Sequence, residues 1–525
     1  MSAFTRFLDW INSEVPSADA LTGAEKVPLI QTSATKQSLL STLADYVVQT
    51  ATAFLQSGTG AIAETVQAMG RRVVWASQYG SGFTTTPGGD IAKAITALGA
   101  DGGIVELPPG SVTLEAQVSI PSKITLRGRG IGVTNITAKA SLNAHAFINS
   151  DASGGNSNIE LLDFTYDGNY ANQTTGNGVV ITKGTYCYIE IETKNCHGTG
   201  QTFSGGSNNR AGPKNISRSN GLAGAGYGLY FFNSDDNQVE GGGIYDDNCI
   251  GVVIEASGAS ATAKRNKVGP VKARGNRADF SQSGAGVHWE DSAGGDANDG
   301  ELVGPICTGG TGVGINNTGT NLHIMGGTVQ GNTKAGVVSS AAVGFLYVGI
   351  KMLDNGAGDA GGYQTQMRFD DTGLNPASSG EVIGCKGSGT VEGLKTFSTF
   401  GAVKVIHCDF DGSTNDYNFA SANDQLIVTD SVSADNGDAA ASLTAGTSAT
   451  TQRWATALTA ARAVTLNTTG AAKGAKFHIV RSGGDTGGPW NLNVGTGPLK
   501  ALVAGTWCEV KYNGSAWFLS AYGAL

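Results

Sequence analysis

A glycine followed by a short run of apolar residues recurs along the middle of the chain. Between residues 178 and 340 the glycines that open this phrase lie 50, 23, 35, 28 and 22 residues apart. They are Gly178, Gly228, Gly251, Gly286, Gly314 and Gly336. A basic period of 22 to 25 residues, with insertions in some turns, is typical of stacked repeat units. The repeat therefore predicts a solenoid.

A second apolar phrase falls between the first ones, as in Val268-Gly-Pro-Val271 and Val303-Gly-Pro-Ile306. Each turn should thus contain two or three short strands, which bury a shared core only when turns stack. We expect Gly and Asn at the corners to supply positive φ angles. An antiparallel sandwich would need Asn-Gly or Asp-Gly pairs at hairpin spacing, which do not recur here. The pattern predicts an all-β chain with a right-handed, single-stranded parallel β-helix over residues 76–433.

The two ends of the chain differ from this middle. In residues 1–75, apolar positions at helical spacing and a heptad seam over Lys36 to Gln56 predict a small helical segment. That segment either packs on its own domain or joins a trimeric bundle. Residues 434–452, rich in Ala, Ser, Thr and Gly, are expected to form a linker. Alternating apolar and polar residues over 453–525 predict a carboxy-terminal β domain.

Composition narrows the function classes. The 525-residue chain has 79 Gly, only 15% charged residues and a net charge of −9, which argues against nucleic-acid binding. Its seven Cys show no Cys-x-x-Cys spacing, so we expect neither a zinc site nor a full disulfide framework, and most of them should fill the interior of the solenoid. The stretch Asp296 to Glu301 favours a turn over a Ca²⁺ loop. No metal, cofactor, signal peptide or membrane span is expected.

The candidate chemistry follows from the strand alternation. Counting from each anchoring glycine, positions +1 and +3 should point inward and positions +2 and +4 outward. Glu255 and Glu290 both fall at +4 on neighbouring turns. Turns stack about 4.8 Å apart, so the two carboxylates could lie roughly 5 to 8 Å from each other, a range that covers both retaining and inverting glycosidases. The pair is therefore the candidate catalytic pair, and the competing interpretation is an ordinary solvated face.

Other residues could share these roles. Asp291 is an alternative acid, and His288 could assist or serve as the base of a lyase. Tyr230, Phe232, His288 and Trp289 are candidates for saccharide contact. Further acids weighed as alternatives are Asp246, Asp247, Asp163 and Asp167.

Positive charge gathers in one segment of this acidic protein. Residues 264–277 contain six cations and no acid, among them Arg265, Lys267 and Arg274. Such a cluster could contact an anionic polysaccharide. Alternatively it neutralises the acids that follow, which are Glu290, Asp291, Asp296, Asp299 and Glu301. The two interpretations stay open.

Several segments resemble phage virion proteins. The stretch Leu21 to Gln31 is similar to the amino-terminal attachment segment of phage fibres and spikes, and Gln56 to Gln67 is similar to the connector that leads into tailspike β-helices. Asp90 to Leu98, Gly102 to Gly110 and Ile120 to Gly128 resemble the opening of the pectate-lyase-like superfamily. The acidic run usual in that opening is replaced here by Gln78-Tyr-Gly80 and Thr84 to Gly89.

The resemblance implies a phage tailspike or virion spike. It implies a capping helix near residues 90–99, attachment to other virion proteins through residues 1–75, and a carboxy-terminal domain that trimerises or contacts carbohydrate. The partner would be a host capsular or surface polysaccharide. Depolymerase activity, as a glycoside hydrolase or less readily a lyase, is compatible with it. A homotrimer assembled in the host bacterial cytoplasm and located in the virion is expected. The alternative is a structural fibre or a capsid or baseplate decoration that cleaves no glycan.

Overall fold

A computed structural model provides the structure of this protein. It describes residues 73–221, 226–277, 284–292, 295–357, 364–370, 378–389, 392–397, 402–412, 417–418, 424–427, 433–446 and 448–525. The helical segment predicted for residues 1–75 lies outside the described residues except for its last three. Those three form strand β1 (Val73–Trp75), which pairs with β2 (Gly103–Glu106) and so belongs to the first turn of the solenoid.

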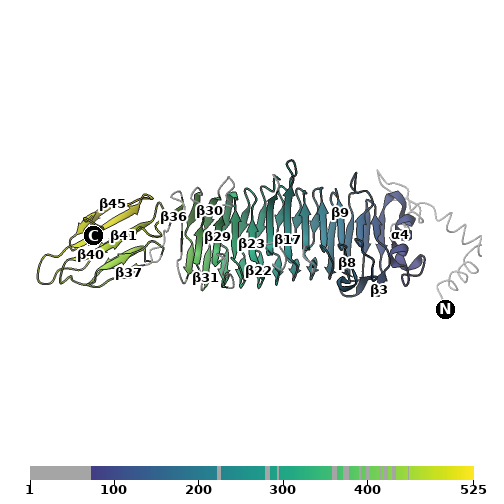
Figure 1. Ribbon diagram of the computed structural model, residues 1–525, viewed down its shortest axis with the longest axis horizontal. Helices are drawn as coiled ribbons and strands as arrows, with labels where there is room; N and C mark the ends of the chain where they lie inside the picture. Colours follow the sequence, from purple (N-terminus) through teal and green to yellow (C-terminus); the bar gives the residue numbers. More distant parts are fainter. Residues whose placement is uncertain are drawn as a thin grey trace, which may run out of the picture. The chain divides into compact units, whose positions relative to one another are not determined.

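Parallel strands stack in three rows, as Figure 1 shows along the body of the solenoid. Row 1 consists of β4 (Val118–Ile120), β7 (Phe147–Asn149), β9 (Val179–Thr182), β11 (Gln201–Ser204), β14 (Tyr227–Phe232), β17 (Ile250–Ser257), β20 (Ala285–Ser292), β23 (Val313–Asn317), β26 (Val337–Ser340), β29 (Thr365–Asp370), β32 (Glu392–Thr396) and β35 (Tyr417–Asn418).

Row 2 follows row 1 along the chain in each turn. It consists of β1, β2, β5 (Ile124–Arg127), β12 (Arg210–Ala211), β15 (Gln238–Val239), β18 (Lys267–Val268), β21 (Glu301–Val303), β24 (His323–Met325), β27 (Val343–Val348), β30 (Ser379–Ile383), β33 (Ala402–Ile406) and β36 (Gln425–Ile427).

Row 3 completes the turn. It consists of β3 (Gly110–Leu114), β6 (Thr134–Ala138), β13 (Ile216–Arg218), β16 (Ile244–Asp246), β19 (Lys272–Arg274), β22 (Ile306–Thr308), β25 (Thr328–Gln330), β28 (Lys351–Leu353), β31 (Lys386–Gly389) and β34 (Asp409–Gly412). The longer strands β8 (Glu160–Asp167) and β10 (Tyr188–Lys194) pair with strands of both row 2 and row 3. The predicted parallel β-helix is confirmed.

The glycine-anchored phrases lie on row 1, and their alternation builds the core. On β17 and β20, the +1 and +3 residues Val252, Ile254, Val287 and Trp289 are fully buried. Residues of rows 2 and 3, such as Val268 and Ala273, close the same core from the other sides. The seven cysteines are all buried, and none of them forms a disulfide.

Close approach, and not a positive φ, explains the anchoring glycines. None of the six has a positive φ. A Cβ on Gly251 would lie 2.5 Å from the carbonyl oxygen of Gly286 and 3.1 Å from the Asn276 amide nitrogen. Gly228, Gly314 and Gly336 meet an asparagine amide in the same way. The positive φ angles expected at the corners occur at other residues, including Asn208, Asn233, Gly205 and Gly275.

The asparagines in question form buried ladders that join successive turns. At the corner between rows 3 and 1, the side-chain oxygen of Asn248 accepts hydrogen bonds from the backbone and side-chain nitrogens of Asn220, at 3.1 and 3.0 Å. Asn276 accepts from Asn248 in turn. A second ladder of Asn209, Asn237 and Asn266 runs along the corner that leads into row 2. These ladders satisfy corner backbone groups that would otherwise be buried without partners.

Helix α4 (Pro87–Leu98) packs against β1 to β4 at the start of the β-helix (Figure 1). Its buried face includes Ile91, Ala94, Ile95 and Leu98, so it covers the apolar end of the solenoid. The short helices η2 (Ala76–Gln78), η3 (Gly99–Asp101) and η4 (Tyr170–Asn172) complete the helical content of the described part. No helix there is long and apolar enough to cross a membrane.

The carboxy-terminal part contains two further sheets. One comprises β37 (Ser433–Asp435), β39 (Thr451–Trp454), β41 (Lys476–Arg481), β44 (Thr506–Tyr512) and β45 (Trp517–Ala524). The other comprises β38 (Ala441–Leu443), β40 (Arg462–Leu466), β42 (Leu492–Val494) and β43 (Lys500–Leu502).

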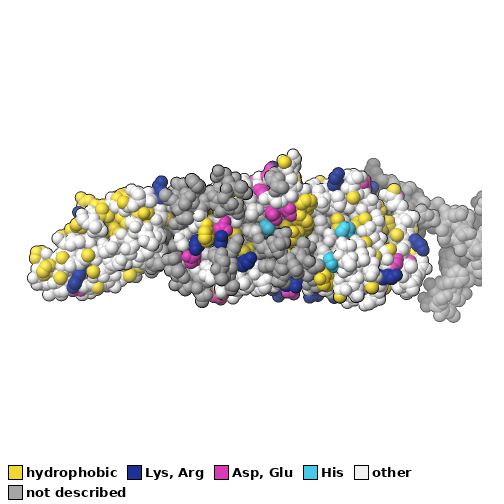
Figure 2. All heavy atoms as spheres, viewed as in Figure 1, with side chains coloured by type: hydrophobic (Ala, Val, Ile, Leu, Met, Phe, Trp, Pro, Cys, Tyr) yellow, Lys and Arg dark blue, Asp and Glu magenta, His cyan; other side chains and the backbone are white. Residues whose placement is uncertain are grey.

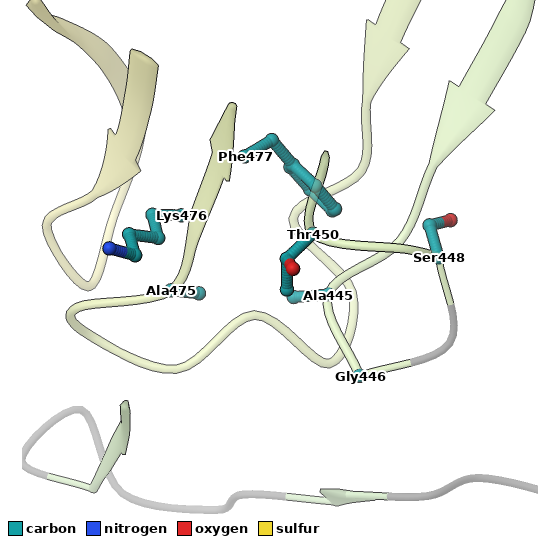
Figure 3. A pocket seen from close by; sticks show the side chains of 7 residues that line it. All are labelled: Ala445, Gly446, Ser448, Thr450, Ala475, Lys476 and Phe477. Atoms are coloured by element: carbon teal, nitrogen blue, oxygen red, sulfur yellow. The ribbon is translucent and has the colours of Figure 1, made fainter. Parts of the chain in front are cut away.

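Strand pairing in this part changes direction along the chain. The first strands pair in parallel, and β41, β44 and β45 then pair antiparallel. The segment 434–452, expected to be a linker, contains most of β37, all of β38 and the start of β39, which pair with strands that follow. Figure 3 shows a hollow beside Phe477 whose volume of about 20 Å³ holds about one water molecule.

Candidate active site on row 1

The two glutamates predicted to act together occupy paired positions on adjacent strands. Strands β17 and β20 pair in parallel with Glu255 opposite Glu290 and Ala256 opposite Asp291. On the other side of β17, Phe232 of β14 lies opposite Glu255. Figure 2 shows acidic and apolar side chains gathered on one face near the middle of the β-helix. Both glutamates are partly buried and lie on the outer side of row 1.

Two hydroxyl groups hold the Glu255 carboxylate. The Tyr230 hydroxyl donates to Oε2 at 2.5 Å, and the Ser292 hydroxyl donates to Oε1 at 3.0 Å. Each carboxylate oxygen therefore has a donor from a neighbouring strand. Burial raises the pKa of Tyr230, and the hydrogen bond to Glu255 raises it further, so the phenol keeps its proton as a donor. Glu255 is an oriented, hydrogen-bonded carboxylate.

Glu290 has a different environment. Burial raises its pKa to about 6, and the negative charges of Glu255 and Asp291 add to this effect. Its Oε2 lies 3.6 Å from His288 Nε2, too far for a hydrogen bond. No hydroxyl donor like those on Glu255 is found for it among the described residues. The two carboxyls on adjacent strands thus differ in their surroundings: hydroxyl donors hold Glu255, whereas burial and nearby negative charge raise the pKa of Glu290.

His288 is an uncharged neighbour of this pair. Its side chain is only 7% exposed, and burial lowers its pKa to about 4. Asn316 Nδ2 lies 3.0 Å from His288 Nε2, which makes Nε2 the acceptor when the ring is neutral. Within the described residues Nδ1 is buried without a hydrogen-bond partner. His288 is thus a buried, neutral neighbour of Glu290 that makes no hydrogen bond to it.

Three aromatic rings border the carboxylates. The Tyr227 and Tyr230 ring centroids lie 4.9 Å apart in an edge-to-face arrangement, and those of Tyr230 and Phe232 lie 5.4 Å apart. Tyr227 and Tyr230 pack against a cluster of apolar residues that includes Ile250 and Val253 and is separate from the solenoid core. Aromatic rings beside carboxylates are the groups that stack on sugar rings and bond to their hydroxyls. Tyr230 and Phe232 therefore occupy positions consistent with the predicted saccharide contact.

Trp289 does not occupy such a position. Its side chain is fully buried in the solenoid core, and its indole N–H has no hydrogen-bond partner among the described residues. The reason is its place at +3 from Gly286, an inward position by the strand alternation. A saccharide in solvent cannot reach it, so its predicted role in binding is corrected to one in packing.

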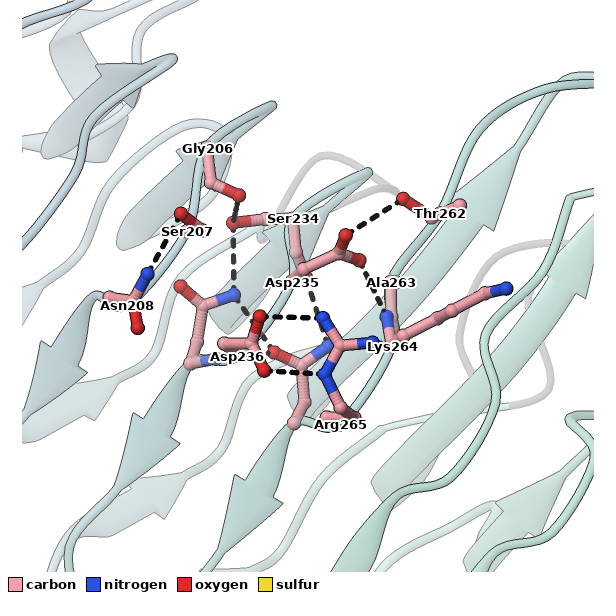
Figure 4. Close-up of polar contacts among 12 residues, drawn as sticks. Gly206, Ser207, Asn208, Ser234, Asp235, Asp236, Thr262, Ala263, Lys264 and Arg265 are labelled. Carbon is pink, nitrogen blue, oxygen red and sulfur yellow. Dashed lines mark hydrogen bonds and ion pairs between the residues drawn. The ribbon is translucent and has the colours of Figure 1, made fainter.

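The predicted basic contacts are also placed elsewhere. Lys267 begins β18 on row 2 and Arg274 ends β19 on row 3, whereas the glutamate pair lies on row 1. Arg265 forms a two-pronged ion pair with Asp236 at 2.7 and 2.6 Å, which Figure 4 shows at the corner between rows 1 and 2. Arg274 pairs with Asp246, and Lys267 with Glu301 at 3.1 Å.

These pairs neutralise charge between stacked turns. The acids involved include residues of the preceding turn, Asp236 and Asp246, which the sequence interpretation had not considered as partners. Lys264 pairs with Asp296, an acid that it had considered. Of the two interpretations of the basic segment, the arrangement favours neutralisation over an open anion-binding patch next to Glu255 and Glu290.

The remaining acids have structural partners. Asp291 accepts a hydrogen bond from the Ala297 backbone, and its own backbone N–H donates to the Thr318 hydroxyl at 3.0 Å. Burial raises the pKa of Asp291. Asp163 and Asp247 have positive φ angles at corners, and Asp167 lies 3.8 Å from Lys194. Only Asp291 is next to the glutamate pair.

Three residues of the site were not assigned a role from sequence. Ser292 lies at +6 from Gly286, beyond the positions considered, and Tyr227 comes just before its anchoring glycine. Asn316 occupies the same outward column as His288, two residues after Gly314, which was the available signal. No group of three or more His, Cys, Asp or Glu that could hold a metal ion is found among the described residues.

No family model matches this chain, and no curated protein matches it. Similar solved structures include the A-module of the mannuronan C-5 epimerase AlgE4 from Azotobacter vinelandii, with 16% identity, a TM-score of 0.44, and coverage of 68% of this chain and 97% of that chain. The family 28 exopolygalacturonase of Yersinia enterocolitica has 11% identity, a TM-score of 0.48 and coverage of 68% and 78%.

A third similar structure is the tailspike protein of E. coli bacteriophage HK620, solved as a double mutant in complex with a pentasaccharide. It has 14% identity, a TM-score of 0.45 and coverage of 82% of each chain. These likenesses concern the fold.

Proposed function

We propose that this protein is a virion spike that binds a bacterial surface polysaccharide and hydrolyses its glycosidic bonds at Glu255 and Glu290. One observation carries the catalytic part: two carboxyls occupy paired positions on adjacent strands, one held by two hydroxyl donors and the other with a raised pKa. Pairs of acids with separated proton affinities are the means by which glycosidases combine acid and base chemistry.

Glu290 is the proposed general acid. With a pKa of about 6 it keeps a proton in weakly acidic solution, and it gives that proton to the glycosidic oxygen as the bond to the leaving sugar breaks. His288 lies next to Glu290 and is neutral, so its ring supplies no positive charge that would lower the pKa of this carboxyl. Asn316 holds the imidazole ring in place.

Glu255 is the proposed second carboxylate. Its two hydroxyl donors hold both oxygens in a fixed orientation, as a nucleophile or base requires. Adjacent strands lie about 4.8 Å apart, close to the separation of roughly 5 to 5.5 Å that characterises retaining enzymes. In that route Glu255 bonds to the anomeric carbon while Glu290 protonates the departing oxygen. Water, deprotonated by Glu290, then releases the sugar and restores both groups.

The aromatic rings of Tyr227, Tyr230 and Phe232 are proposed to hold the sugar beside the carboxylates. Stacking on such rings is tolerant of sugar identity, whereas the hydrogen-bonding groups around them select it. Tyr230 would then serve both ends of the site, with its ring on the ligand and its hydroxyl on Glu255.

The placement in a virion rests on the sequence resemblance. Residues 1–75 are proposed to attach the spike to other virion proteins, and the part from residue 433 onward to join three copies or contact carbohydrate. A trimer would present three sites and multiply weak binding through avidity. A rigid solenoid suits this role because its outer face keeps the same geometry in every copy.

Incubating the purified protein with bacterial capsular polysaccharides tests the proposal. Hydrolysis produces reducing ends without ultraviolet absorbance, whereas a lyase also produces an unsaturated, absorbing product. Glu290→Gln and Glu255→Gln should each abolish the new reducing ends, and Glu301→Gln on row 2 is the matched control. Binding without any cleavage by the wild-type protein would contradict the hydrolase and point to a non-enzymatic spike.

A further inference from the structure

A second hollow lies on row 2, on a different sheet from the glutamate pair. It has a volume of about 350 Å³, and it runs across β8, β10 and β12 to Glu240, the residue that follows β15. The residues that line it are Glu160, Tyr186, Cys187, Tyr188, Asn208, Arg210 and Glu240. None of these residues has a part in the row 1 site.

Tyr186 has an unusual backbone for its side chain. Bridges between Ser157, Thr185 and Ser207 align the residues that follow them, so Tyr186 stacks between Asn158 and Asn208 at one corner. All three corner residues have φ near 56° (56°, 56° and 57°). Asn tolerates this left-handed conformation well, while a bulky aromatic residue does so at a cost. Aromatic residues held in such a conformation tend to mark functional positions.

The Tyr186 ring is also free to meet a ligand. Its side chain is 63% exposed, which is the largest exposure among the aromatic residues of the described β-helix. No hydrogen bond or ring contact of its side chain is found within the described residues. An exposed ring without an internal partner, beside a hollow, is a surface on which an apolar sugar face can stack.

The polar groups next to Tyr186 are held in place by a hydrogen bond and an ion pair. The Tyr188 hydroxyl donates to Glu190 at 2.9 Å, and its phenol lies over Gly212, where a Cβ would come within 2.2 Å of the hydroxyl oxygen. The Arg210 guanidinium lies 5.6 Å from the Tyr188 ring centroid and pairs with Glu240. Arg210 is still 54% exposed, so its remaining N–H groups face solvent.

The charges of the lining indicate the class of ligand. Two carboxylates, Glu160 and Glu240, accompany one guanidinium, and the Glu160 carboxylate accepts a hydrogen bond from Thr125 at 2.9 Å. A net negative lining repels a polyanion. Carboxylate acceptors, the Asn208 amide and guanidinium donors together suit a ligand with many hydroxyls and no charge.

We propose that this hollow is a second saccharide-binding site, with Tyr186 as its stacking platform, that takes a neutral, hydroxyl-rich stretch of a bacterial surface polysaccharide. The inference rests on the proposed function, since it assumes a polysaccharide partner. It adds a binding site that does no chemistry and lies on a separate row, so one copy of the protein holds the polymer at two places.

The variant Tyr186→Asn tests this site directly. It removes the ring and installs the residue found at the same corner on both neighbouring turns, so it should fold with an equal or higher thermal midpoint. Binding is measured for the full chain on a printed array of bacterial capsular and O-antigen polysaccharides, followed by titration with the best-bound one. We expect affinity to fall about tenfold. Tyr186→Phe keeps the ring and should bind like wild type.

Met325→Asn is the control, since Met325 is an apolar residue of β24 on row 2 that is 41% exposed and lies outside both sites. The site is refuted if Tyr186→Asn binds as tightly as wild type, or if Met325→Asn weakens binding equally. If Glu290→Gln abolishes cleavage while Tyr186→Asn still weakens binding, the result supports the second site. This support does not depend on which residues carry out the catalysis. Absence of wild-type binding anywhere on the array refutes both the site and the polysaccharide-binding spike.

Discussion

The hydroxyl group of Tyr230 donates a 2.5 Å hydrogen bond to the Oε2 atom of Glu255, although the two residues belong to successive turns. Val253, and not Glu255, is the strand partner of Tyr230, so the bond runs diagonally across the outer face of row 1. This contact links the aromatic ring that is proposed to stack on a sugar to the carboxylate that is proposed to react with it.

Replacing Tyr230 with Phe should lower the rate of polysaccharide cleavage while leaving affinity nearly unchanged. The ring stays, but Glu255 loses one of its two hydroxyl donors. A hydrogen bond to a charged group contributes roughly 1.5 to 3 kcal/mol, so kcat should fall about 10- to 100-fold. Reducing-end assays under saturating polymer measure the change, and Tyr522→Phe serves as control. An unchanged kcat would mean that Glu255 does not depend on this donor.

Cleavage should decline as the pH rises through about 6, because Glu290 must be protonated to act as an acid and its pKa is raised to about 6. His288 stays neutral throughout that range, since its pKa is about 4. The pH profile of kcat/KM therefore reports Glu290 on its alkaline side. A rate that keeps rising above neutrality would contradict this assignment and indicate that Glu290 acts as a base.

Glu290→Gln should stabilise the fold at neutral pH and have little effect in acid. The folded state raises the pKa of this carboxyl from 4.5 to about 6, so it binds a proton more tightly than the unfolded chain does. The resulting stability is fully present below pH 4.5 and is lost as the pH rises through about 6. Removing the charge should then add about 1 to 2 kcal/mol above that pH.

Urea unfolding of wild type and Glu290→Gln on both sides of this window measures the difference in unfolding free energy. Equal stabilisation at every pH would show that the gain has a cause other than relief of a buried charge. Because the gain appears in a variant that should not cleave, this prediction can be tested without any knowledge of the sugar.

Trp289→Ala should reduce stability by about 3 to 5 kcal/mol, since it empties the largest fully buried side chain of the core. Trp289→Phe should cost less because it keeps most of the ring volume. Circular dichroism during thermal unfolding measures both. Loss of glycan binding with an unchanged unfolding midpoint would contradict the core placement and restore Trp289 as a ligand contact.

The asparagine ladder predicts a large contrast between two polar substitutions. Asn248→Ala leaves buried groups of Asn220 and Ser217 without partners and should cost roughly 3 kcal/mol. Arg274→Gln breaks an exposed ion pair with Asp246 and should cost less than about 1 kcal/mol. Unfolding in urea compares them, and equal losses would show that the ladder is not a main source of stability.

The fold could be predicted from sequence because its signal repeats. Each Gly-anchored phrase forms a row 1 strand, so even an imperfect alignment of turns places Glu255 and Glu290 in one outward column. The reason for the glycines was less accessible: a Cβ on Gly251 would collide with the carbonyl oxygen of Gly286 on the next turn and press on the Asn276 amide, contacts visible only in three dimensions.

The site could be predicted only in part, since many of its contacts join residues far apart in sequence. The ion pair of Arg265 is with Asp236, which is 29 residues earlier, so the charges counted in a short window appeared unpaired. Trp289 was predicted to contact the ligand because it is aromatic. Its position, three residues after Gly286, already predicted a side chain that points inward. Ser292 was missed because the row 1 strand continues further than the apolar phrase that marks it.

Turns of unequal length keep their carboxyl groups in register. Gly228 and Gly251 lie 23 residues apart and Gly251 and Gly286 lie 35 apart, yet Glu255 still faces Glu290. The strands thus remain aligned although the turns differ in length. A solenoid built on this plan can acquire new surface loops without moving its paired carboxyls out of register.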